Sequence, residues 1–233
     1  MAINQNQSAR PGVGTALTSA PRRVMLADAE FKVRGVIVDG SLSRDPGNTG
    51  NVDYLRAGTI LGQITATGLY RPASIGVLTV AYVDDDTTQT MMTVGTATAT
   101  ELARLGSSGT FTITGPPTAA GTVATETVTY SAVNTTTGVI TVSAAGADYV
   151  AGSRLGGVDG SQVPVLLLGD GQPLKVTDAS DASIDVELPR AVIGGTVDSS
   201  QVIDWPSDTS MVAAIKAQFN TVSGSRFVFD DAF

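Results

Sequence analysis

The chain has 233 residues, of which 42 % are hydrophobic and 15 % charged, so it can bury a core as one large domain or two small ones. It contains no cysteine and no histidine. This excludes disulfides, cysteine-ligated zinc and the Ser-His-Asp and Cys-His catalytic arrangements. Only three lysines could serve a Ser-Lys dyad, namely Lys32, Lys175 and Lys216. A glycosidase pair of carboxylates is not excluded by spacing, but aromatic residues to line a sugar site are scarce, with one Trp, five Tyr and six Phe. We therefore expect a protein that is not an enzyme and that holds no cofactor or catalytic metal.

Charge is distributed unevenly along the chain. All 22 acidic residues lie at or after Asp28, whereas residues 1–27 contain Arg10, Arg22 and Arg23 and no acid. The first 27 residues thus carry +3, and the remainder carries 11 positive and 22 negative charges, or −11. An acidic body disfavours binding of nucleic acid.

The apolar run at residues 163–168 is far shorter than the roughly 18 residues of a membrane span. The N-terminus lacks the features of a secretion signal. We expect a protein made in the cytoplasm that binds neither nucleic acid nor membrane.

Residues 1–23 predict an arm without regular structure. Asn, Gln, Ser, Gly, Pro and Thr dominate this segment, and its apolar residues recur with neither a helix nor a strand period. Two interpretations stay open from composition alone. The arm is either a disordered terminus without a role or a segment that becomes ordered on a partner.

The next 50 residues have strand patterns. Residues 24–38 place apolar side chains at strand-like spacing, and residues 41–51 form a loop with a turn at Asp45-Pro46-Gly47-Asn48. Residues 55–72 predict two strands joined by a tight turn at Thr67-Gly68.

Composition shifts near Ser74, and threonine then dominates residues 87–141, which is typical of exposed strand faces. Residues 110–114 and 127–133 alternate, and residues 134–138 form a turn before a return strand at 139–143. A short helix interrupts this region. We expect Thr100 to cap it, Leu102 and Leu105 to face inward and Gly106 to end it.

The last part of the chain combines strands with one helix. Residues 163–168 and 174–176 predict a hairpin with its turn at residues 170–171, and residues 184–188 alternate with Ile184, Val186 and Leu188 on one face. The helix at 208–220 is capped by Ser207 or Asp208, and its inward stripe consists of Met211, Ile215 and Phe219. A short strand at 226–229 follows.

Trp205 either covers the core or contributes to an oligomer contact. The clusters at residues 84–86 and 230–231 are carboxylate-rich, and we interpret both as solvated loops rather than cation sites.

One run of residues resembles a known family. The segment 55–72, Leu-Arg-Ala-Gly-Thr-Ile-Leu-Gly-Gln-Ile-Thr-Ala-Thr-Gly-Leu-Tyr-Arg-Pro, resembles the lambda-type head decoration proteins of tailed bacteriophages, although Leu69 stands where that pattern often has lysine. The resemblance resumes at residues 159–168, 185–187 and 191–197, and it ends in the helix and the strand around Phe227. The residues that carry the family motif are Arg56, Ala57, Gly58, Thr59, Gly62, Gly68, Tyr70, Pro72 and Gly195.

The resemblance implies a mainly β protein made of several parts. These are an arm (1–23), a decoration core in two pieces (24–73 and 159–233, with a helix at about 208–220) and a Thr-rich β domain of 85 residues inserted at 74–158. It also implies a homotrimer on the outer surface of an expanded viral head, at three-fold and quasi-three-fold sites, with the major capsid protein and neighbouring trimers as partners. The arm would add a strand to a capsid edge. Its candidate contacts are Ile3, Arg10, Val13, Leu17, Arg22 and Arg23.

The same residues leave an alternative open. A tail or fibre component of a virion could also carry a Thr-rich β module, which would then bind a host surface or a carbohydrate.

Overall fold

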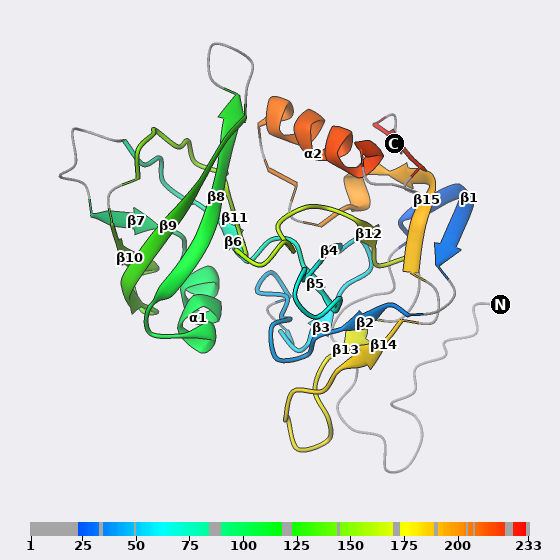
Figure 1. Cartoon of the computed structure of the whole chain (residues 1–233), viewed down its shortest axis with the longest axis horizontal. Coiled ribbons are helices and arrows are strands. Elements are labelled where there is room, and N and C mark those ends of the chain that lie inside the picture. The colour runs from blue at the N-terminus through cyan, green and yellow to red at the C-terminus, as the bar shows by residue number, and fades with distance from the viewer. Residues whose placement is uncertain are drawn as a thin grey trace.

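The structure is a computed structural model that describes residues 23–32, 35–48, 50–83, 90–117, 123–143, 145–169, 173–188, 191–203, 205–206, 208–221 and 226–231. It is mainly β with a C-terminal helix, as the sequence predicts. Figure 1 shows two sheets side by side, one with the short helix α1 and the other near the C-terminal helix α2, which lies beside both.

The larger sheet is built from both ends of the chain. Its order is β1-β15-β12-β4-β5-β2-β14, and β16 pairs in parallel with β15. The strands are β1 (Met25–Lys32), β2 (Ile37–Val38), β4 (Ile60–Gln63), β5 (Tyr70–Pro72), β12 (Leu166–Leu167), β14 (Val186–Glu187), β15 (Ala191–Asp198) and β16 (Arg226–Asp230). Strands β3 (Tyr54–Leu55) and β13 (Leu174–Lys175) form a separate pair beside it.

Two predicted turns of this region are confirmed. The Asn48 amide donates to the Asp45 carbonyl at 2.9 Å, which closes the turn at 45–48. Strands β4 and β5 pair antiparallel, and Gly68 between them has φ +73°. A glycine adopts this left-handed conformation without the strain that a Cβ atom brings.

The second sheet contains the threonine-rich region. Its order is β6-β11-β8-β9-β10-β7. The elements are β6 (Gly76–Val77), β7 (Met91–Thr93), α1 (Thr96–Leu105), β8 (Gly109–Pro117), β9 (Val123–Asn134), β10 (Val139–Val142) and β11 (Arg154–Gly156). The predicted β9–β10 turn is confirmed, since the Gly138 amide donates to the Asn134 carbonyl at 2.9 Å.

Helix α1 begins earlier than the sequence predicts. Gly95 with φ +77° is its N-cap, and Thr100 lies inside the helix, where its hydroxyl donates to the Thr96 carbonyl at 2.8 Å. The cap predicted at Thr100 is therefore wrong, because this threonine satisfies its hydroxyl on the preceding turn. The predicted end at Gly106 is confirmed by its amide donating to the Leu102 carbonyl.

The hairpin predicted from residues 163–176 is also wrong. Strand β12 lies in the larger sheet between β15 and β4, whereas β13 pairs with β3. Leu166 and Leu167 are fully buried and need cover on both faces, which a central position provides. The alternation predicted to place Ile184, Val186 and Leu188 on one face does not extend over the whole segment. Strand β14 is only two residues long, and Ile184 is exposed while Leu188 is buried.

Helix α2 (Thr209–Thr221) agrees with the prediction to within one residue. The Asp208 carboxylate accepts from the amides of Ser210 and Met211 at 2.9 and 3.0 Å, so Asp208 is the cap. The alternative cap, residue 207, lies outside the described residues. Met211, Ile215 and Phe219 form the buried stripe.

The buried apolar residues separate into clusters that follow the two sheets. One cluster draws all its members from residues 75–155, and the other two draw theirs from residues 24–73 and 166–227. Both ends of the first region meet in one place, where β6 pairs with β11 and the Ile75 amide donates to the Leu155 carbonyl at 2.8 Å. We call residues 75–156 the insert and the rest of the described chain the core.

Candidate functional site

Arg56, the first residue of the motif that resembles decoration proteins, holds a loop in place. Its guanidinium contacts both oxygens of Asp45, at 2.6 and 2.8 Å. The Arg56 carbonyl accepts from the amide and hydroxyl of Thr59, at 3.1 and 2.7 Å. This bidentate geometry is the strong form of an ion pair, and it joins the loop at 45–48 to the beginning of β4.

Two motif glycines allow backbone segments to approach closely. Gly58 has φ +91°, and a Cβ atom there would collide with the Gln201 carbonyl. A Cβ atom on Gly62 would collide with the Ser161 carbonyl. Gly62 therefore packs against the segment that enters β12, and no larger residue fits without moving that segment.

The remaining motif residues also lie in the framework of the sheet. Ala57, Tyr70 and Pro72 are buried, Gly68 is in the β4–β5 turn, and Gly195 pairs with Phe227. The motif thus builds the core rather than presenting reactive groups. The structure brings eight of its nine members together around β4 and β5 and places Gly195 on β15.

Of the predicted arm contacts, only Arg23 is described. It is exposed, and its Nε donates to the Met25 carbonyl at 3.4 Å. Ile3, Arg10, Val13, Leu17 and Arg22 lie outside the described residues. The described chain begins just before β1, the strand at one end of the sheet order, and β1 pairs irregularly with β15.

Charged side chains buried in the core connect distant segments. Arg71 on β5 is 7 % exposed at its side chain and pairs with Asp159 at 3.3 Å. Burial lowers the pKa of Arg71, and the nearby Asp159 carboxylate partly offsets that effect. Arg44 contacts Asp53 at 2.8 Å and also donates to the carbonyls of Gly40 and Ser43. These pairs fix loops rather than create a reaction centre.

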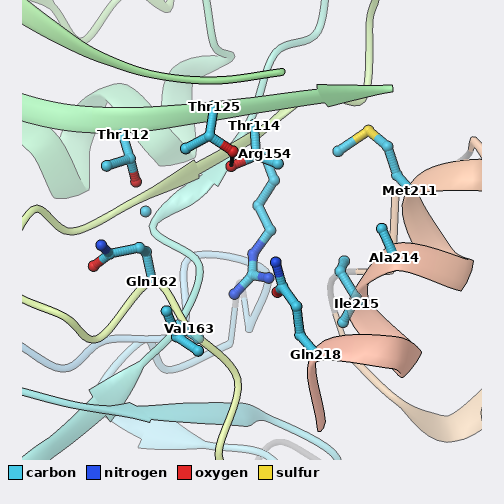
Figure 2. A pocket seen from close by; sticks show the side chains of 12 residues that line it. Thr112, Thr114, Thr125, Arg154, Gln162, Val163, Met211, Ala214, Ile215 and Gln218 are labelled. Carbon is cyan, nitrogen blue, oxygen red and sulfur yellow. Dashed lines mark hydrogen bonds between the residues drawn. The ribbon is translucent and has the colours of Figure 1, made fainter. Parts of the chain in front are cut away.

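A cavity of about 160 Å³ lies at the seam between the insert and the core. Figure 2 shows threonines of β8 and β9 on one side and α2 on the other, with the Arg154 side chain extending toward Gln218. The lining combines a guanidinium and amide and hydroxyl groups with apolar side chains of α2. Arg154 was not predicted as a site residue, because a single arginine before a leucine gives no local signal that its side chain is buried.

Trp205 lies against the core. It is half-buried beside the cluster of Phe219 and Phe227, its indole donates to the Ser199 carbonyl at 2.6 Å, and its ring meets that of Phe229 edge-on. Lys216 lies over both rings and pairs with Asp231 at 2.6 Å. Trp205 thus covers part of the core, as one of its two interpretations predicts, and its contribution to an oligomer contact stays a prediction.

Two observations concern metals and membranes. The described residues contain no group of three or more potential metal-ligating side chains, and residues 84–86 lie outside them. In the described part of the chain, neither helix is long and apolar enough to cross a membrane.

Comparisons with protein-family models, with curated proteins and with solved structures each found no match to this chain.

Proposed function

We propose that the chain is a structural protein of a tailed-phage virion that binds the outer surface of the expanded head as a trimer and stabilises the shell. In this proposal it is not an enzyme. Its partners are the major capsid protein, two further copies of itself and, through the insert, neighbouring trimers. Neither nucleic acid nor membrane is a partner.

One observation carries the proposal. The four separate segments that resemble decoration proteins, residues 55–72, 159–168, 185–197 and 208–229, meet in one sheet with one helix, although the insert separates the first from the second. Short Gly- and Thr-rich motifs recur by chance. Motifs that agree in order and also assemble into one folded unit are harder to explain in that way.

The position of β1 supports the role proposed for the arm. Residue 23 leads directly into a strand at the end of the sheet order, so residues 1–22 connect to the described chain at a sheet edge. The arm carries a net charge of +3 from Arg10, Arg22 and Arg23, whereas residues 28–233 carry a net charge of −11. An acid-free segment can supply main-chain donors and acceptors to a sheet edge of an acidic partner. Three arms in a trimer then act together, which multiplies a weak single contact.

The proposal is tested by adding the purified protein to undecorated expanded heads of the phage that encodes it and counting bound copies after sedimentation. We expect saturation at a multiple of three per head and loss of binding when residues 1–22 are removed. A matched control keeps the arm's composition but permutes its order, which separates strand pairing from net charge. Full occupancy by the truncated chain would show that the arm is not the anchor, and no binding by the intact chain would refute the decoration function.

A second candidate is a tail or fibre component whose insert binds a host surface or a carbohydrate. It is favoured by the hydroxyl-rich outer face of β9, where Thr125, Thr127, Thr129 and Ser131 are exposed. Virions that carry a label on the insert separate the candidates, because electron microscopy places the label on the head in one case and on the tail in the other. A glycan array without hits argues against an insert that binds carbohydrate.

A further inference from the structure

The insert joins the core through a narrow neck. Strands β6 and β11 pair at Val77–Arg154 and Gly76–Leu155, and the chain passes directly into the core on both sides. Hinges of this kind consist of a few residues at the ends of elements, which absorb a change in backbone angles.

Two clefts lie beside the neck, between the insert and the core. The cavity of about 160 Å³ lies between the insert and α2, and a second of about 190 Å³ lies between α1, β8 and the core residues Leu42, Arg71 and Asp159. Beside the strands that join them, the insert and the core are thus separated in part by open clefts, one of which α2 borders.

A charged contact crosses this seam at α1. Arg104 donates from Nε and Nη2 to the Glu101 carboxylate at 2.7 and 2.6 Å, and from Nη1 to the Ser41 carbonyl of the core at 2.6 Å. Glu101 is buried, so it fixes the plane of the guanidinium and directs the remaining nitrogen toward the core.

The acceptor in the core is also held rigidly. The Asp39 carboxylate accepts from the Ser41 amide at 2.9 Å, the Ser41 hydroxyl at 2.6 Å and the Leu42 amide at 3.1 Å. The loop at 39–42 thus presents the Ser41 carbonyl in one position. Another bond across the seam, from the Thr112 hydroxyl to the Gly157 carbonyl, lies at the neck itself, because Thr112 pairs with Gly156. A bond at the pivot constrains rotation less than one at α1.

We propose that α1 and the loop at 39–42 form a clasp that holds the insert at one angle about its neck, and that release of Arg104 lets the insert rotate against the core. The Arg104 side chain is 30 % exposed, so water and salt compete for its contacts. The clasp is therefore releasable. This inference concerns contacts within the chain and does not depend on decoration of a viral head.

The absence of cysteine from the sequence allows a direct test, because two introduced cysteines are the only attachment points for spin labels. Thr136→Cys in the exposed β9–β10 turn and Ala179→Cys in an exposed core turn report the angle between the two parts. Pulsed electron paramagnetic resonance then gives the distance distribution between the labels. We expect Arg104→Gln to roughly double its width, while Arg104→Lys, which can still donate to Ser41, restores part of the narrow distribution.

The control is Thr100→Ala on the same helix, since the Thr100 hydroxyl bonds only within α1 in the described contacts. Its distribution should match that of the labelled parent. A parental distribution in a folded Arg104→Gln variant overturns the clasp. Should that variant not fold, Glu101→Gln is measured, which keeps Arg104 but removes the carboxylate that fixes its guanidinium. Broadening in Glu101→Gln supports the clasp, and an unchanged width overturns it.

Discussion

Replacing Phe219 by alanine tests whether the core is stabilised separately from the insert. Phe219 is fully buried, and its ring lies 4.9 Å from that of Phe227 and 5.5 Å from that of Phe229. Removing a buried phenylalanine ring costs about 3–5 kcal/mol through lost burial and the cavity left behind. The three rings lie between α2 and β16, so we expect a loss of about 4 kcal/mol from the core.

The single tryptophan provides the assay. Trp205 packs on the same cluster, with its ring 5.6 Å from that of Phe229, so its fluorescence reports unfolding of the core. With a denaturant dependence of about 2 kcal/mol per molar urea, Phe219→Ala lowers the tryptophan midpoint by about 2 M. Protein concentration is held constant, because association with other copies would shift the midpoint.

Phe111→Ala is the matched control in the insert. Phe111 is equally buried but belongs to the cluster drawn from residues 75–155. We expect it to reduce amide protection in β8 and β9 while leaving the tryptophan midpoint nearly unchanged. If Phe111→Ala lowers that midpoint as much as Phe219→Ala does, the two parts unfold as one unit, and the division into insert and core has no energetic meaning.

Three further substitutions test individual contacts by urea unfolding. Asp45→Asn removes the charged partner of the partly exposed Arg56 and should cost about 1–3 kcal/mol. Gly62→Ala forces a Cβ atom into the facing Ser161 carbonyl and should lower the free energy of unfolding by about 2–3 kcal/mol. A loss below about 0.5 kcal/mol, the size of a typical surface substitution, would contradict the predicted clash. Burial, and then Glu126, raise the pKa of Tyr149. The stability that neutral Tyr149 contributes to the fold is therefore complete below the unfolded pKa of about 10 and is lost as the pH rises above it. Tyr149→Phe should flatten this loss of stability at alkaline pH.

Local features of the sequence predicted local structure well. The turn at Asn134–Gly138 needs a side chain that bonds the following amides, and the Asn134 carboxamide oxygen accepts from those of Thr136 and Thr137 at 3.0 and 3.1 Å. Helix α2 combines a capping carboxylate with an apolar stripe of period four, and its position was predicted to within one residue. In both cases the determining contacts lie within a few residues of one another.

Strand pairing between distant segments was not predictable in the same way. Strands β12 and β13 contain two residues each, which is too short for an alternating pattern to identify a face or a partner. Their partners, β4 and β3, lie more than 100 residues earlier in the chain. The Arg104–Ser41 contact likewise joins residues 63 positions apart. Such contacts depend on tertiary packing, for which a single sequence has no local signal.

The topology of the core explains how it can contain an insert of this size. Strand β4 pairs with β5 on one side and β12 on the other, so the chain leaves the sheet and returns to it beside the same strand. The returning segment bonds to the β4–β5 hairpin before β12 begins, with the Thr65 amide donating to the Asp159 carbonyl at 2.8 Å and Arg71 pairing with Asp159. The entropy cost of closing a loop grows slowly with its length, and the ends of the insert already meet at the β6–β11 pair. The core therefore closes on its own contacts, and the insert is free to be shaped by a separate role.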